Sequence, residues 1–203
     1  MVINAKTRIV PVWIAATATL LCVACSALTP KASSPEAPVG TQSSANASGE
    51  LRYKVPAGWM TEHPTSGMRA AQYKLPKTEG DAEDASLVLY YFGAGQGGSV
   101  QANIDRWIGQ MVQTDGTSSK DRAKTETLTV NGLKVTTLDL SGTFTAEMSP
   151  GSGTANNKGN YRLRAAVVET PKGAYFAKLI GPEKTVAHWN QAFLDYVNSF
   201  EFK

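Results

Sequence analysis

The pattern of apolar and polar positions divides the chain into three stretches. The first contains an apolar run over residues 9–24 that carries no charge. The second, residues 25–49, is rich in Ser, Ala, Pro and Gly and has few large apolar side chains. From residue 50 onward, apolar residues recur with the periods of strands and helices, which predicts a single globular domain over residues 50–203.

Short apolar runs predict the strands of this domain. The expected strands span residues 51–55, 68–75, 85–92, 125–130, 133–143, 161–169 and 174–180. The run at 85–92 is almost unbroken, which indicates a strand that is buried on both faces near the centre of a sheet. Asn131-Gly132 predicts a hairpin between two of the strands, and the turn at 170–173 predicts a second hairpin.

Two segments have the period of a helix. Ser99 is expected to cap the first with its hydroxyl group, and the apolar face of this helix comprises Val100, Ile104, Trp107, Ile108 and Met111. Pro182 is expected as the first residue of the second helix, whose apolar stripe comprises Val186, Trp189, Phe193 and Val197. Hairpin links between most strands then predict an α+β fold, with an antiparallel sheet of about six to seven strands flanked by two helices.

The first 25 residues have the layout of an export signal. Lys6 and Arg8 precede the apolar run, which is shorter than the ~20 residues of a membrane-crossing helix. Val23 and Ala24 before Cys25 resemble the signal of bacterial lipoproteins, in which the cysteine receives a diacylglyceryl group and the chain is cut just before it. We therefore expect a lipoprotein signal peptide over 1–24, and a lipidated Cys25 with a disordered tether over 25–49. Cleavage after Ala27, which would give a soluble product, is the alternative.

Composition excludes several classes of function. Both cysteines, Cys22 and Cys25, precede the domain, so no disulfide is expected in it. The net charge of +3 at pH 7 includes Lys6 and Arg8, and the mature chain is therefore close to neutral and is not expected to bind nucleic acid. The histidines, His63 and His188, are far apart, and no catalytic motif is present. We expect no enzyme activity, no cofactor and no metal site.

Three segments carry a resemblance to known proteins. YYFGAGQGGSVQANIDRWIGQ (90–110), NGLKVTTLDLSGTF (131–144) and AYFAKLIGP (174–182) resemble a family of uncharacterised bacterial lipoproteins. The order of elements is also similar to that of PsbP, the extrinsic photosystem subunit, and its nonphotosynthetic relatives. The resemblance implies a PsbP-like α-β-α sandwich and a noncatalytic role in binding or assembly.

One candidate binding surface combines polar residues beside Trp107 with two arginines on one strand face. Its members are Asn103, Arg106, Trp107, Gln110, Arg162 and Arg164. Arg106 has the fork-shaped donor geometry that suits a carboxylate, a phosphate or a partner loop. The alternative is that Trp107 belongs to the core and that the arginines lie on solvated faces.

The segment 93–98 matches the pattern G-x-G-x-x-G between a strand and a helix. A hairpin follows it rather than a parallel βαβ unit, so no dinucleotide is expected. The segment is either a flexible turn or an anion-binding loop, and the candidate anion-loop residues are Gly95, Gly97, Gly98 and Ser99.

Two further segments have alternative interpretations. The acidic loop, with Glu79, Asp81, Glu83 and Asp84, is either solvated or able to hold a hard cation through oxygen ligands. The polar segment 145–160 is either a mobile hairpin tip or a binding loop.

Together these features predict an exported, lipid-anchored, noncatalytic binding or assembly domain of the bacterial cell envelope. The expected partners are membrane lipid, through acylated Cys25, and an envelope protein. In bacterial lipoproteins an Asp after the cysteine tends to retain the protein at the inner membrane, so the resemblance, with Ser26 at this position, implies the periplasmic side of the outer membrane in a host with two membranes. The alternative is a carrier of a small anion, or a hydrolytic domain, that uses the 93–98 loop and Arg106.

Overall fold

The computed structural model describes residues 49–145 and 157–203. The expected signal peptide, Cys25 and most of the tether lie outside the described residues, as does most of the polar segment 145–160. The strands are β1 (Leu51–Arg52), β2 (Met60–Glu62), β3 (Arg69–Leu75), β4 (Ala85–Tyr91), β5 (Met111–Val112), β6 (Lys124–Val130), β7 (Leu133–Phe144), β8 (Lys158–Thr170), β9 (Gly173–Pro182) and β10 (Glu201–Phe202). The helices are α1 (Val100–Ile108), α2 (Ser119–Arg122), α3 (Glu183–His188) and α4 (Asn190–Asn198).

Eight strands form one sheet in the order β2-β3-β4-β9-β8-β7-β5, and β6 also pairs with β7. Every pairing in this sheet is antiparallel, which confirms the predicted α+β class. The sheet has eight strands rather than six to seven because the short strands β2 and β5 extend it at its edges. β1 lies outside it and pairs with β10 from the end of the chain.

The two predicted hairpins build most of the sheet. β6 and β7 meet through Asn131 and Gly132, which both have the positive φ, 47° and 82°, that a tight hairpin turn requires. β8 and β9 meet through Pro171 and Lys172, with Thr170 opposite Gly173. β9 then pairs with β4 on its other side, so β4 lies in the interior of the sheet, as its unbroken apolar run predicts.

A β-bulge interrupts β3 between Arg69 and Ala71. Ala71 pairs with Leu89, whereas Arg69 pairs with Tyr90, the next residue of β4. Because successive side chains of a strand alternate between faces, the extra residue turns Arg69 onto the same face as Tyr90. The bulge explains why residues 68–75 do not alternate cleanly in the sequence.

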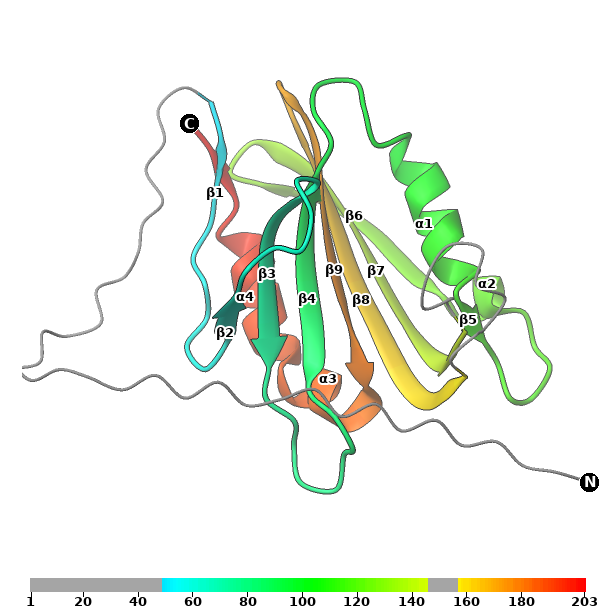
Figure 1. Cartoon of the computed structure of the whole chain (residues 1–203). Coiled ribbons are helices and arrows are strands. Elements are labelled where there is room, and N and C mark those ends of the chain that lie inside the picture. Colours follow the sequence, from blue (N-terminus) through cyan, green and yellow to red (C-terminus); the bar gives the residue numbers. More distant parts are fainter. Residues whose placement is uncertain (1–48, 146–156) are drawn as a thin grey trace, which may run out of the picture. The chain divides into compact units, whose positions relative to one another are not determined.

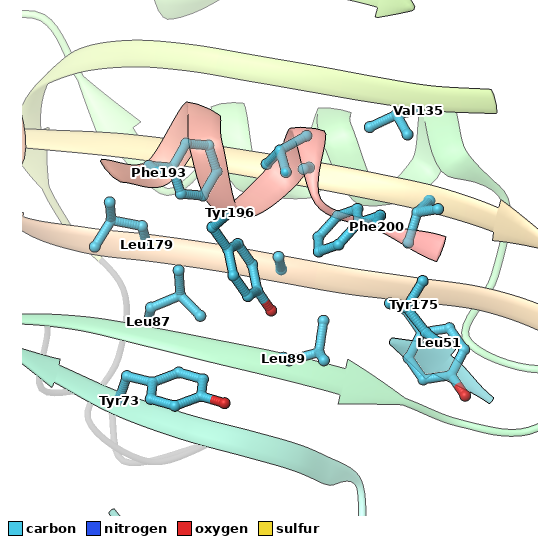
Figure 2. Packing of buried hydrophobic residues seen from close by; sticks show 14 of the residues in the cluster. Leu51, Tyr73, Leu87, Leu89, Val135, Tyr175, Leu179, Phe193, Tyr196 and Phe200 are labelled. Atoms are coloured by element: carbon cyan, nitrogen blue, oxygen red, sulfur yellow. The ribbon is translucent and has the colours of Figure 1, made fainter. Parts of the chain in front are cut away.

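One face of the sheet is buried beneath α3 and α4. Phe193, Tyr196 and Phe200 are fully buried and pack against strand residues that include Leu87 and Leu179, as Figure 2 shows. The predicted C-terminal helix is in fact two helices that meet at Trp189. Pro182 is the N-cap of α3 rather than its first helical residue, so that prediction was wrong by one position.

The opposite face of the sheet is covered by α1 (Figure 1). Ile104 and Trp107 from this helix pack with Leu163 of β8 and Phe176 of β9 in a second apolar cluster. The sheet therefore lies between α1 on one side and α3 with α4 on the other, because its central strands are apolar on both faces.

Phe193→Ala tests the packing of α4 on the sheet. Phe193 is fully buried, and removal of such a ring costs about 3–5 kcal/mol of unfolding free energy. Urea denaturation followed by circular dichroism measures this loss. Gln191→Ala, on the exposed side of α4, is the control, and we expect it to stay within about 0.5 kcal/mol of the wild type. Equal stability of the two variants would contradict the packing described here.

Candidate functional site

The candidate site is built around α1, which is fixed at its start by side-chain hydrogen bonds. The Ser99 hydroxyl group accepts a hydrogen bond from the Ala102 amide at 3.1 Å, as predicted for the N-cap. The buried Asn103 side chain donates to the carbonyl oxygens of Gly97 at 2.8 Å and Ser99 at 2.9 Å. Asn103 thus holds the glycine-rich loop against the helix, and this is a structural role that the sequence did not indicate.

The 93–98 loop has a steric reason for its glycines. Gly97 has φ of 87°, and a Cβ atom there would lie 2.6 Å from the Phe92 ring and 2.9 Å from the Phe176 ring. β4, which precedes the loop, pairs only with antiparallel neighbours, so a dinucleotide fold is excluded. The anion role of Gly95, Gly97, Gly98 and Ser99 stays a prediction.

Beside this helix lies a pocket of about 200 Å³. It is lined by Tyr90 and Phe92 from the end of β4, by Arg106, Trp107 and Gln110 from α1 and the turn after it, and by Phe176 and Lys178 from β9. Three of the six predicted surface residues, Arg106, Trp107 and Gln110, thus meet in one place. Trp107 is only 3% exposed, so the alternative that it belongs to the core is also correct.

Lys178 brings a positive charge into an apolar part of the sheet. Its neighbours across the strand pairs are Val88 and Ala165. Its ammonium group donates to Gln110 Oε1 at 2.5 Å and lies 5.2 Å from the centre of the Phe144 ring. Burial, together with the nearby charge of Arg106, lowers the pKa of Lys178 from 10.5 to about 8.

Arg106 supplies a second cation at the same pocket. Its side chain is exposed, and one of its nitrogens donates to Asn103 Oδ1 at 2.5 Å, which leaves further N–H groups for another partner. Arg69 lies nearby, with its guanidinium group 5.9 Å from the centre of the Tyr90 ring. Within residues 49–145 and 157–203, no ion pair involves any of these three cations, Arg106, Lys178 and Arg69. The pocket is therefore positively charged and has no internal counter-ion among the described residues.

Arg162 and Arg164 do not join this surface, because they lie on the opposite face of the sheet. Arg162 binds Asp139 through two hydrogen bonds of 2.8 and 2.7 Å. Burial opposes ionisation of Asp139, but the hydrogen bonds of Arg162 and the charge of Arg164 keep the pKa of this carboxyl group below its usual value. Arg164 is buried rather than solvated, since it donates to Asn190 Oδ1 and lies 5.2 Å from the centre of the Phe193 ring. Arg164 is therefore part of the packing beneath α4, and Asp139 pairs with both arginines.

Three of the four carboxylates of the acidic loop have partners within the described part of the protein. Asp81 accepts hydrogen bonds from the Thr185 amide and hydroxyl groups at 2.8 and 2.6 Å. Glu83 binds Lys158 at 2.7 Å, and Asp84 accepts from the Lys77 amide at 2.8 Å. In the part of the chain that the structure describes, no cluster of His, Cys, Asp and Glu could hold a metal ion. The acidic loop is the connection between β3 and β4, and these contacts attach it to neighbouring elements.

Sequence reasoning missed Lys178, Tyr90 and Phe92. Lys178 did have a signal, since it is the single charged residue in the apolar run over 174–180. It shares the parity of Phe176, which packs against α1, and a charged residue on a buried strand face is unusual. Nothing in the sequence distinguished Tyr90 and Phe92, because aromatic side chains in an apolar strand are typical of a hydrophobic core.

No protein-family model and no curated protein matches the chain. Among solved structures, LpqN, which is involved in cell envelope biogenesis of Mycobacterium tuberculosis, is similar at 12% identity with a TM-score of 0.49, over 79% of this chain and 87% of LpqN. A protein of unknown function from Pseudomonas aeruginosa is similar at 14% identity with a TM-score of 0.42, over 70% and 94% of the two chains. PsbP from the cyanobacterium Synechocystis is similar at 12% identity with a TM-score of 0.43, over 82% and 100%. Likenesses of this degree say nothing about a ligand, and the lipoprotein family stays a prediction.

The described helices are all too short or too polar to cross a membrane. The predicted export signal lies outside the residues to which this finding applies.

Lys178→Met tests whether the charge of Lys178 lowers the free energy of unfolding. Because a lowered folded-state pKa means that the folded protein binds the proton less tightly, the cost is full below pH 8 and disappears as the pH rises towards 10.5. We expect the variant to be more stable than the wild type at pH 7, by up to roughly 3 kcal/mol. The difference should shrink by pH 10.

Urea denaturation at pH 7 and pH 10 measures both quantities, with Lys120→Met on the exposed surface of α2 as the control. Comparing each variant with the wild type at the same pH cancels the titration of the other groups. A wild type that is as stable as Lys178→Met at pH 7 would show that the charge carries no penalty.

Proposed function

We propose that this protein is an exported, lipid-anchored domain of the bacterial cell envelope that binds a small anion at the pocket beside α1, without catalysing a reaction. The observation that carries the binding function is the convergence of Arg106 and Lys178 on this pocket, with no ion pair for either among the described residues. Lys178 is half-buried, and a partly desolvated ammonium group without a counter-ion costs stability. An anionic ligand would supply the missing negative charge.

The lining of the pocket also supports a binding role rather than catalysis. None of the lining residues is an acid, a histidine or a cysteine. Activation of water or of a nucleophile needs a neighbouring base, a lowered pKa in a nucleophile or a metal ion. Lys178 has the lowered pKa, but no carboxylate, histidine or cysteine lines the pocket beside it. We therefore propose that Lys178 contributes charge.

Export and anchoring are proposed from the sequence. Lys6 and Arg8, the apolar run after them and the small residues before Cys25 support a lipoprotein signal. Two or three acyl chains on one cysteine bind a membrane stably, whereas a single chain binds reversibly. The outer membrane, for a host that has one, and an envelope protein as a further partner stay predictions.

Mass spectrometry of the mature N-terminus tests the anchor. We expect the N-terminal peptide to begin at Cys25 and to carry acyl chains, and the protein to sediment with membranes. Cys25→Ser should abolish acylation and cleavage before residue 25, because the thiol that receives the lipid is lost. Cys22→Ser is the matched control and should leave the anchor in place. A mature chain that begins at Leu28, or retains Met1, would contradict lipid anchoring.

Titration with acetate, benzoate and phosphate, followed by nuclear magnetic resonance of the labelled domain, tests anion binding. We expect at least one of these anions to shift the amide signals of Arg106, Gln110 and Lys178. Arg106→Gln and Lys178→Met should each weaken binding at least tenfold, since each removes one of the two charges. Lys120→Met should bind as the wild type does.

The pH dependence gives an independent reading of the same site. Lys178 loses its charge as the pH rises through about 8. The groups that face it are Arg106 from α1 and Tyr90 from β4, with uncharged neighbours on both adjacent strands. If only the charged form of Lys178 binds the anion, the affinity should fall about tenfold between pH 7 and pH 9.

Failure of acetate, benzoate and phosphate all to bind would overturn the proposed function.

A further inference from the structure

The lining of the pocket includes two groups of side chains. Those with N–H donors, Arg106, Gln110 and Lys178, are called its polar end, and the rings of Tyr90, Phe92 and Phe176 are called its aromatic wall. Tyr90 and Phe92 lie with their ring centres 6.0 Å apart and their planes within 1° of parallel. Phe176 meets Phe92 edge to face, with the ring centres 5.6 Å apart. Arg106 and Lys178 lie on the same pocket. A ligand that satisfied only the charges would leave the aromatic wall exposed to water.

We propose that the ligand of this pocket is a small monocarboxylate that carries one flat, apolar ring. This inference rests on the proposed function, because it names the class of anion that the site would hold. It is carried by the arrangement of donors, aromatic rings and volume, and each of these restricts the ligand independently.

The donors at the polar end suit a carboxylate. Gln110 Oε1 already accepts from Lys178, which leaves the Gln110 amide NH₂ as a donor. Arg106 likewise uses one nitrogen for Asn103 and presents the rest of its planar fork, which matches the two oxygens of a carboxylate. The polar end thus offers N–H groups from three side chains. Because one of the two cations, Lys178, is half-buried, one negative charge is enough to compensate the desolvated charge.

The aromatic wall and the volume restrict the rest of the ligand. A dry cavity of about 150 Å³ is known to hold benzene, so a pocket of about 200 Å³ has room for one ring together with a carboxylate. Pockets for larger organic ligands typically exceed about 300 Å³. A flat ring beside Tyr90 and Phe92 would gain both apolar contact and favourable ring–ring geometry. Acetate and phosphate would reach the donors but not cover the rings.

Comparison of four probes by isothermal titration calorimetry at pH 7 tests the class of ligand. Benzoate has the ring and the charge, acetate has the charge alone, phosphate has a tetrahedral charge, and benzyl alcohol has the ring alone. We expect benzoate to bind at least tenfold more tightly than each of the others. Phe92→Leu keeps an apolar side chain of similar size but removes the ring, and it should reduce the preference for benzoate over acetate at least threefold.

The outcomes separate this inference from the function on which it rests. Acetate or phosphate binding as tightly as benzoate would overturn the aromatic carboxylate while leaving the anion site in place. Benzyl alcohol binding as tightly as benzoate would overturn the requirement for charge, and with it both proposals. If Phe92→Leu unfolds, Tyr90→Leu provides the same comparison from the other ring. Unchanged selectivity in a folded variant of either ring would also count against the proposal.

Discussion

The structure depends on a sheet whose central strands are apolar on both faces. In β4, Leu87 and Leu89 pack on one side, whereas Val88 and Tyr90 lie on the other, so both sides of the sheet need a cover. α3 and α4 cover the first side, and Figure 2 shows Phe193 and Tyr196 of α4 above the strand residues. The cover on the second side is α1, which has nine residues and so spans only about 13 Å. The candidate pocket lies where this short cover ends, and Tyr90 and Phe92 are therefore only half-buried.

Features with a local cause were predictable from the sequence, and features that depend on distant contacts were not. The Asn131-Gly132 turn, the Ser99 cap and the apolar run of β4 each express a preference within a few residues. The candidate site instead needs Lys178 beside Gln110, and these residues are 68 positions apart. The orientation of Arg69 depends on a bulge, and the burial of Arg164 depends on which face α4 covers. The two-residue period of a strand assigns a side chain to one face of the sheet, but it does not identify the element that packs on that face.

The cations on the two faces of the sheet have different partners. On the face that α4 covers, Arg162 and Arg164 share Asp139, with nitrogen–oxygen distances of 2.7 and 3.6 Å, so each arginine has an ion-pair partner within the fold. Beside α1, Lys178 has an amide oxygen and an aromatic ring as its partners. These are weaker sources of compensation than a carboxylate. A structural role explains the first arrangement, whereas the second leaves Lys178 without a carboxylate partner among the described residues.

This difference also determines how binding and stability are connected. The free protein bears the cost of burying the Lys178 ammonium group beside Arg106, and this cost lowers its pKa. A bound carboxylate would favour the charged form, so ligand and proton would each strengthen the binding of the other by the same factor. Because the uncompensated charge destabilises the empty site, relief of this cost on binding would add to the affinity of the ligand. Replacement of Lys178 by an apolar residue would give a more stable sheet without this coupling, which is an example of the trade-off between stability and function.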